Sequence, residues 1–81
     1  METRTAERLA QDYAALGDSV DLINAIIAGD SMADESAEDR QDCVNRNTQH
    51  LEIMVAKEDW GSEDMTATNA AIAAGNGYTA S

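Results

Sequence analysis

The most regular stretch of the chain is residues 3–29, with the sequence TRTAERLAQDYAALGDSVDLINAIIAG. Its apolar side chains recur at alternating steps of three and four residues: Ala6, Leu9, Tyr13, Leu16, Val20, Ile23 and Ile27. This spacing places them on one face of an α-helix over three heptads. Gly29 follows directly, and glycine commonly ends a helix. The sequence therefore predicts a long amphipathic helix over residues 3–28.

A weaker pattern of the same kind predicts a second helix over residues 34–59. Its inward positions are Ala37, Gln41, Val44, Thr48, Leu51 and Val55, and two of these six are polar. Ser36, followed three residues later by Asp39, resembles the capping box that begins many helices. Large apolar side chains are scarce in the first half of this segment, so we expect that half to stay hydrated and the second half to pack.

A break at Trp60 and Gly61 separates the second helix from a short third one, which we expect over residues 63–74 with Ser62 as its cap. Its expected buried face is Met65, Ile72 and either Thr68 or Asn69. The remaining residues, 75–81, form an irregular tail. Trp60 is expected to close the open end of the hairpin made by the two long helices.

Together these segments predict an all-α fold, a long antiparallel helical hairpin with a short third C-terminal helix. The 81 residues suffice for a single small domain, residues 1–81. Leu, Ile and Val together number 12 and Phe is absent, so the core is thin. A core in a chain of this size supplies about 3–5 kcal/mol. Self-association or docking on a partner would add to that stability.

The charge of the chain is strongly one-sided. Sixteen acidic residues stand against five basic ones, for a formal net charge of −11. Such a chain does not hold nucleic acid or an anionic membrane through its overall field. One cysteine cannot form a disulfide within the chain, and the sequence has neither a signal peptide nor an apolar run of about 18 residues. We therefore expect an intracellular protein with no direct nucleic-acid partner and no membrane partner.

No arrangement of residues points to catalysis, to a cofactor or to a metal. Cys43 and His50 are seven residues apart, about 10.5 Å along a helix, which is too far for them to share a zinc ion. A calcium loop beginning at Asp30 would need glycine at its sixth position and glutamate at its twelfth, where the chain has Glu35 and Gln41. Motifs such as GxGxxG, HExxH and GxSxG are absent. We expect a protein that is not an enzyme, with no catalytic residues, no cofactor and no metal.

Two surfaces are candidates for binding a partner. The first is the apolar seam of the first helix: Leu9, Tyr13, Leu16, Val20, Ile23 and Ile27. This seam is either the core of an intramolecular hairpin or also a contact with another copy or another protein, because the second helix covers it incompletely. The second is the acidic ridge: Asp34, Glu35, Glu38, Asp39 and Asp42. The ridge is either a solvated face that maintains solubility or a docking surface for a cationic partner.

Residues 51–60, LEIMVAKEDW, are followed by SEDMTA at 62–67 and NAAIAAG at 69–75. These runs resemble the C-terminal half of small uncharacterised helical proteins encoded by tailed bacteriophages, over residues 48–79. The resemblance implies a phage origin, and with it a location in the host cytoplasm or within the virion. It implies no activity and supplies no catalytic residues.

These observations predict a non-enzymatic structural, assembly or interaction protein, such as an accessory component of the virion. Its partner would be a second copy of the chain, giving a homo-oligomer, or another virion or host protein. Two alternatives stay open. One is an acidic DNA mimic that inhibits a host nucleic-acid-binding enzyme, since carboxylates along a helix approximate the DNA spacing of one charge per about 1.7 Å. The other is a regulator that binds one host protein through the helical groove.

Overall fold

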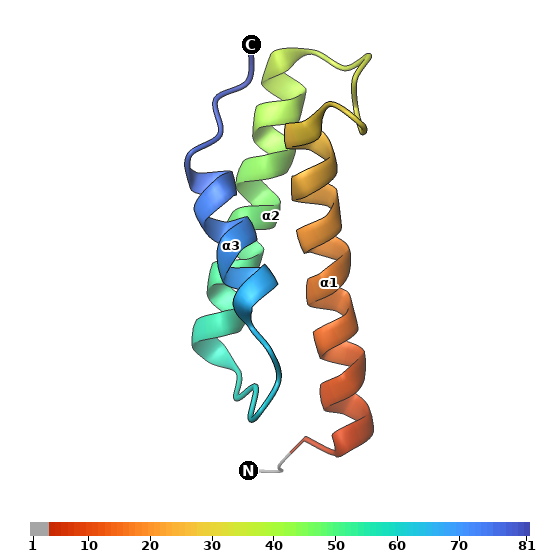
Figure 1. Ribbon diagram of the computed structural model, residues 1–81, viewed down its shortest axis with the longest axis vertical. Helices are drawn as coiled ribbons and strands as arrows, with labels where there is room; N and C mark the ends of the chain where they lie inside the picture. The colour runs from red at the N-terminus through yellow and green to blue at the C-terminus, as the bar shows by residue number, and fades with distance from the viewer. Residues whose placement is uncertain (1–3) are drawn as a thin grey trace.

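The computed structural model describes residues 4–81, which form three α-helices and no strand (Figure 1). Helix α1 spans Ala6–Ala28, α2 spans Ala37–Lys57 and α3 spans Thr66–Asn76. Figure 1 shows α1 and α2 antiparallel, with α3 running back along them in the direction of α1. The molecule measures 44 × 21 × 18 Å along its principal axes. The predicted all-α fold, with two long helices and a short third one, is confirmed.

The core runs along the line where the three helices meet, and each helix contacts the other two. Its buried apolar residues are Leu16, Val20, Ile23 and Ile26 from α1, Val44 and Leu51 from α2, Ala71 from α3, and Trp60 from the loop between α2 and α3. Helix α1 supplies half of this set. Because α2 is too polar to cover α1 alone, α3 and the loop before it complete the burial.

The buried face of α1 shifts at the C-terminal end of the helix. Leu16, Val20 and Ile23 are buried as the spacing predicts, but at the last turn Ile26 is 2% exposed while Ile27 is 39% exposed. Figure 1 shows that α3 ends short of this end of α1. Helix α1 therefore packs there against α2, and the position turned toward α2 is the buried one.

Local hydrogen bonds set both ends of α1. The side chain of Thr5 accepts a hydrogen bond from the N–H of Arg8 at 3.1 Å, so Thr5 is the cap and the helix begins after it. The predicted beginning at residue 3 lies outside the described residues. Gly29 ends the helix with a φ of 85°, as predicted, because glycine adopts this left-handed conformation without steric cost.

Ser36 sets the beginning of α2. Its side chain accepts a hydrogen bond from the N–H of Asp39 at 3.0 Å, the contact that the capping-box spacing predicts. In the preceding turn Met32 has a φ of 56°, which does not fit a right-handed helix. Ser36 itself is extended, with φ −65° and ψ 157°, so helix α2 begins three residues later than the predicted position 34.

Helix α2 ends earlier than predicted because Trp60 folds back into the core. The helix ends at Lys57, and Glu58 is already extended, with φ −106° and ψ 155°. Trp60 is 6% exposed and donates its Nε1–H to the carbonyl of Met54 at 3.0 Å, so it occupies the predicted place at the end of the hairpin. The prediction that Gly61 ends the helix is wrong, since this residue lies in the loop that follows.

Helix α3 begins three residues later and ends two residues later than predicted. The expected cap at Ser62 is wrong, because the side chain that meets the start of the helix belongs to Asp64, whose Oδ1 accepts from the N–H of Thr66 at 3.0 Å. The buried residues of α3 are Thr68, Ala71 and Gly75, while Met65 and Ile72 of the predicted face are half-buried. Small residues therefore face α1 and α2 from this helix.

Gly75 marks a very close approach of α3 to α2. A Cβ at this position would lie 2.0 Å from Oγ1 of Thr48 and 3.1 Å from the Cβ of the same residue. Thr48 is 3% exposed, and within the described residues its hydroxyl has no hydrogen-bond partner. Glycine inside a helix costs about 0.5–1 kcal/mol relative to alanine. Packing against Thr48 explains why the helix carries glycine there, and why it continues past the predicted end at residue 74.

Gly75→Ala is expected to lower the free energy of unfolding by about 1–3 kcal/mol, because the added methyl group forces α3 away from α2. Gly17→Ala is the matched control, since Gly17 also lies inside a helix but a Cβ there meets nothing within 4 Å. The control is expected to gain about 0.5–1 kcal/mol from helix propensity. Urea unfolding followed by circular dichroism measures both values. A gain in both variants would show that the two helices do not meet at Gly75.

Candidate functional site

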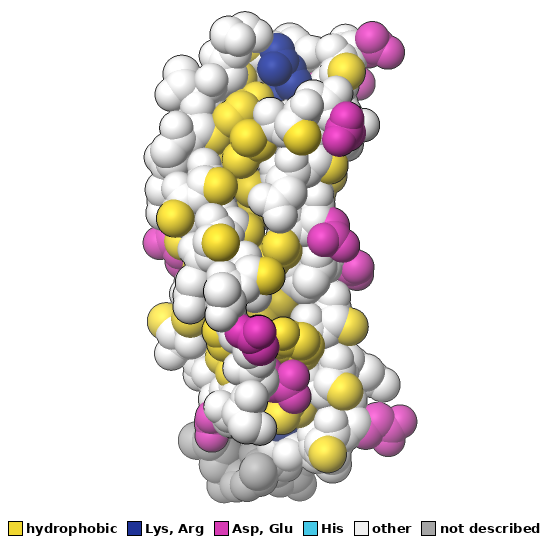
Figure 2. Space-filling view, viewed as in Figure 1, with side chains coloured by type: hydrophobic (Ala, Val, Ile, Leu, Met, Phe, Trp, Pro, Cys, Tyr) yellow, Lys and Arg dark blue, Asp and Glu magenta, His cyan; other side chains and the backbone are white. Residues whose placement is uncertain are grey.

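The apolar seam lies inside the molecule for most of its length. Three of its residues are buried in the core and two are half-buried against it: Leu16, Val20 and Ile23, then Leu9 and Tyr13. Ile27 is exposed. Figure 2 shows a band of hydrophobic side chains along the line where α1 and α3 meet. A second protein would reach the three buried residues only if the helices separated, so in this fold the seam serves as the intramolecular core.

The acidic ridge lies on the surface but only partly on a helix. Its five carboxylate residues are all exposed: Asp34, Glu35, Glu38, Asp39 and Asp42. The predicted helix over residues 34–59 included Asp34 and Glu35, but both lie before α2, because the helix begins after Ser36. Glu38 and Asp39 occupy the first turn of α2, where the positive end of the helix dipole favours carboxylates. Two ridge residues therefore also stabilise the start of the helix.

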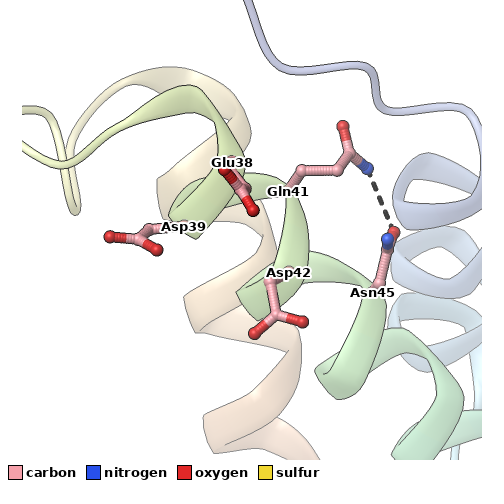
Figure 3. A pocket seen from close by; sticks show the side chains of 5 residues that line it. All are labelled: Glu38, Asp39, Gln41, Asp42 and Asn45. Carbon is pink, nitrogen blue, oxygen red and sulfur yellow. Dashed lines mark hydrogen bonds between the residues drawn. The ribbon is translucent and has the colours of Figure 1, made fainter.

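An acidic hollow of about 430 Å³ lies on the first half of α2 (Figure 3). Its lining residues are Glu38, Asp39, Gln41, Asp42 and Asn45. Figure 3 shows the amides of Gln41 and Asn45 turned toward each other, joined by a hydrogen bond of 3.0 Å, while Asp39 and Asp42 point away from them. Most small-molecule pockets are apolar with a few polar groups. This polar, open hollow is suited instead to basic side chains.

The four arginines all contact groups of the same chain. The two on exposed helix faces pair with a carboxylate one turn away: Arg8 with Asp12 at 3.2 Å and Arg46 with Asp42 at 2.9 Å. Such exposed pairs contribute about 0–1 kcal/mol. Arg4 and Arg40 lie at opposite ends of the molecule and make more extensive contacts.

Arg4 joins the N-terminal end of α1 to the loop after α2. Its Nη1 lies 2.9 Å from Oδ2 of Asp12, and its Nη2 donates to the backbone carbonyl of Asp59. The guanidinium carbon lies 4.8 Å from the ring centre of Trp60, within cation–π distance. Tyr13 flanks the same indole, with ring centres 6.5 Å apart. These contacts close the end of the core that Trp60 fills.

Two carboxylates near this end have lowered pKa values. The hydrogen bond from Arg4, supported by Arg8 and partly offset by desolvation, lowers the pKa of Asp12 below its usual 3.8. Hydrogen bonds from Thr66 lower the pKa of Asp64 below the same value, and the bond from its side chain has a larger effect than the bond from its backbone N–H. Both groups therefore bind their partners as carboxylates, and acid weakens these contacts.

Arg40 and Gln41 hold the C-terminal tail, defined here as residues 78–81, at the other end. Nε2 of Gln41 donates to the carbonyl of Tyr78 at 3.1 Å, and Oε1 of Gln41 accepts from the N–H of Ala80 at 2.8 Å. Nη2 of Arg40 donates to the carbonyl of Ser81 at 2.8 Å. Sequence reasoning missed these contacts. The sequence offers one sign of them: Gln41 is a polar residue at an inward position of the helical pattern, where it needs hydrogen-bond partners.

The charged side chains on the outer surface are mostly acidic. Figure 2 shows acidic side chains along the edge formed by α1 and the α1–α2 loop, and Lys or Arg side chains at one place near the end of the molecule. Glu7, Asp18 and Asp21 of α1 are exposed in addition to the acidic ridge. A partner that approaches this side therefore meets negative charge over most of its length.

Cys43 and His50 form no site together. The Cys43 thiol is free and half-buried, with Nδ2 of Asn47 at 3.5 Å from its sulfur, and His50 is exposed. Within residues 4–81, no three His, Cys, Asp or Glu side chains are grouped so that they could hold a metal ion. None of the described helices combines the length and the apolar character needed to cross a membrane.

Comparison with known proteins gave no match to a family model, to a curated protein or to a solved structure. The function is therefore inferred from the geometry and charge of the chain itself.

Asp12→Asn is expected to destabilise the protein in a pH-dependent way. The folded-state pKa of Asp12 is depressed, so its contribution to stability is present above the unfolded value and is lost as the pH falls through the folded one. The variant should be less stable than the native chain at about pH 7, and the difference should shrink as the pH falls below the usual value of 3.8 and the carboxyl takes up a proton. Urea unfolding across this pH range measures it.

Asp42→Asn is the control for this experiment, because Asp42 pairs with Arg46 one turn away and both side chains are well exposed. It is expected to change the stability by about 0–1 kcal/mol at most. An Asp12→Asn difference that persists unchanged at about pH 2 would contradict the assigned role of the Arg4 contact.

Proposed function

We propose that this chain is a non-enzymatic interaction protein that binds another protein through its acidic surface. The observation that carries the proposal is the placement of the arginines. All four are engaged inside the chain, at Asp12, Asp42, Trp60 and the C-terminal tail, while the acidic ridge faces outward. The four arginines thus contact groups of their own chain, and with Lys57 they stand against sixteen acidic residues, so the outer field is negative. A partner with a basic surface complements it.

A partner of different sequence is favoured over a second copy of the chain. The apolar seam that would join two copies is largely buried within one molecule. Two molecules that each carry a net charge of −11 also repel one another, most strongly at low salt. The homo-oligomer thus has less support than binding to another virion or host protein.

The DNA-mimic alternative has less support from the charge density. A B-DNA segment as long as the 44 Å molecule would carry about 26 phosphate charges, counting both strands. The net charge of the chain is −11, fewer than half of that number. A virion or host protein with a basic surface would serve as this partner, with an accessory place in the virion as one form of this function.

The proposal predicts that the immobilised chain captures basic proteins from a host lysate and releases them at about 1 M salt, where the screening length falls to about 3 Å. Each captured protein is identified, purified and measured in direct binding. Glu38→Gln with Asp39→Asn should weaken the affinity about fivefold, because two exposed carboxylates are lost.

Asp18→Asn with Asp21→Asn is the matched control, because it changes the net charge equally on α1. This control should lose less affinity than the ridge variant, because Asp18 and Asp21 lie outside the acidic ridge. Equal loss in both double variants would leave only a nonspecific charge effect and would contradict docking at the ridge. Sedimentation of the isolated chain is expected to give a monomer, and a stable dimer would favour the homo-oligomer instead.

A further inference from the structure

The C-terminal tail is held through its main chain. Gln41 donates to the carbonyl of residue 78 and accepts from the N–H of residue 80, which lie two residues apart in the tail. A carbonyl and an N–H at this separation lie on the same side of an extended chain, where a neighbouring strand would pair with them. The side-chain amide of Gln41 thus makes the two hydrogen bonds that one residue of a neighbouring strand would make. Contacts of this kind do not depend on which side chains the bound segment carries.

The amide of Gln41 is fixed in the orientation that this contact requires. A Gln side chain has two N–H donors and one carbonyl acceptor. One donor bonds Oδ1 of Asn45 at 3.0 Å, and the other donor and the acceptor bond the tail. Arg40 adds a bond to the carbonyl of Ser81 at 2.8 Å, and its Nη1 lies 3.5 Å from the hydroxyl of Tyr78. The first half of α2 is therefore organised to bind a short peptide segment.

The tail carries no basic side chain to pair with the carboxylates beside it on α2. Gln41 also lines the acidic hollow, together with Glu38 one turn before it on the same helix face. Within residues 4–81 Glu38 forms no ion pair, and the tail side chains beyond Tyr78 are uncharged. A segment with basic side chains could make the same main-chain bonds and also pair with this carboxylate.

We propose that the Gln41 surface of α2 is a binding site for an extended peptide segment with basic residues, supplied by a partner protein, and that the tail occupies this site until the partner displaces it. This inference rests on the proposed function and names the form of the partner. The tethered tail competes at an effective concentration in the millimolar range. An ion pair with Glu38 gives the incoming segment its advantage.

The test uses the full-length chain, labelled with ¹⁵N, and two synthetic peptides, acetyl-Gly-Tyr-Lys-Ala-Lys-amide and acetyl-Gly-Tyr-Thr-Ala-Ser-amide. The lysine peptide should bind saturably and move the backbone amide signal of Ala80 to the position of an unstructured residue. The uncharged peptide should bind about tenfold more weakly, because it lacks the ion pair.

Weakening the tail should strengthen binding of the lysine peptide. Ala80→Pro removes the N–H that Gln41 accepts, so the built-in competitor is weaker and the affinity should rise about tenfold. Thr79→Ala is the control, since Thr79 is exposed and its variant keeps every tail bond described above. Adding Gln41→Ala to Ala80→Pro should abolish the gain, because the incoming peptide then loses the same amide.

The outcomes separate this inference from the proposed function. If the lysine peptide binds equally to the native chain, to Ala80→Pro and to the double variant, or leaves the Ala80 signal in place, the peptide site is refuted. Failure of the lysine peptide to bind refutes it as well. In both cases the proposed function stands or falls on its own measurement, the difference between the ridge and the α1 charge variants in binding a captured basic protein.

Discussion

Covering the inward face of α1 is the constraint on which the whole fold depends. This face supplies half of the buried apolar residues, and α2 offers it only Val44 and Leu51. Helix α3 is short and made of small residues, so it contributes through close approach more than through side-chain volume. Gly75 permits that approach because any side chain there would meet Thr48. The thin core expected from the composition is thus completed within one chain, by a third helix that packs against both long ones.

The two ends of this core are closed by arginines that bind main-chain oxygens as well as side-chain carboxylates. Arg4 bonds a backbone carbonyl and lies over Trp60, and Arg40 bonds the carbonyl of Ser81. Hydrogen bonds from a charged donor contribute about 1.5–3 kcal/mol, more than an exposed ion pair. In an acidic chain this use of the cations has a second effect. Each arginine committed to an end of the core leaves carboxylates elsewhere without a counter-charge, so the contacts that close the fold also set the sign of its surface.

The sequence predicts what depends on local spacing and misses what depends on distant contacts. The apolar rhythm of α1, the stop at Gly29 and the cap at Ser36 are local, and the structure confirms them. Helix α2 ends early because Trp60 turns back into the core, and α3 runs past Gly75 because that glycine meets Thr48. The carboxylates of the acidic ridge are exposed, as a charged helix face predicts, but Asp34 and Glu35 precede the helix. The tail contacts join residues 37 and 39 positions apart in the chain, so no local pattern predicts them.

The same charge distribution limits the kind of partner the molecule can hold. Burying a carboxylate without a matching base costs several kcal/mol, so an interface over the ridge must bring basic groups to it. A second copy brings carboxylates instead, and its arginines are already bound within its own fold. Self-association over this surface would therefore bring like charges together, and these repel. A basic partner meets no such repulsion, and the carboxylates it would pair with already face solvent.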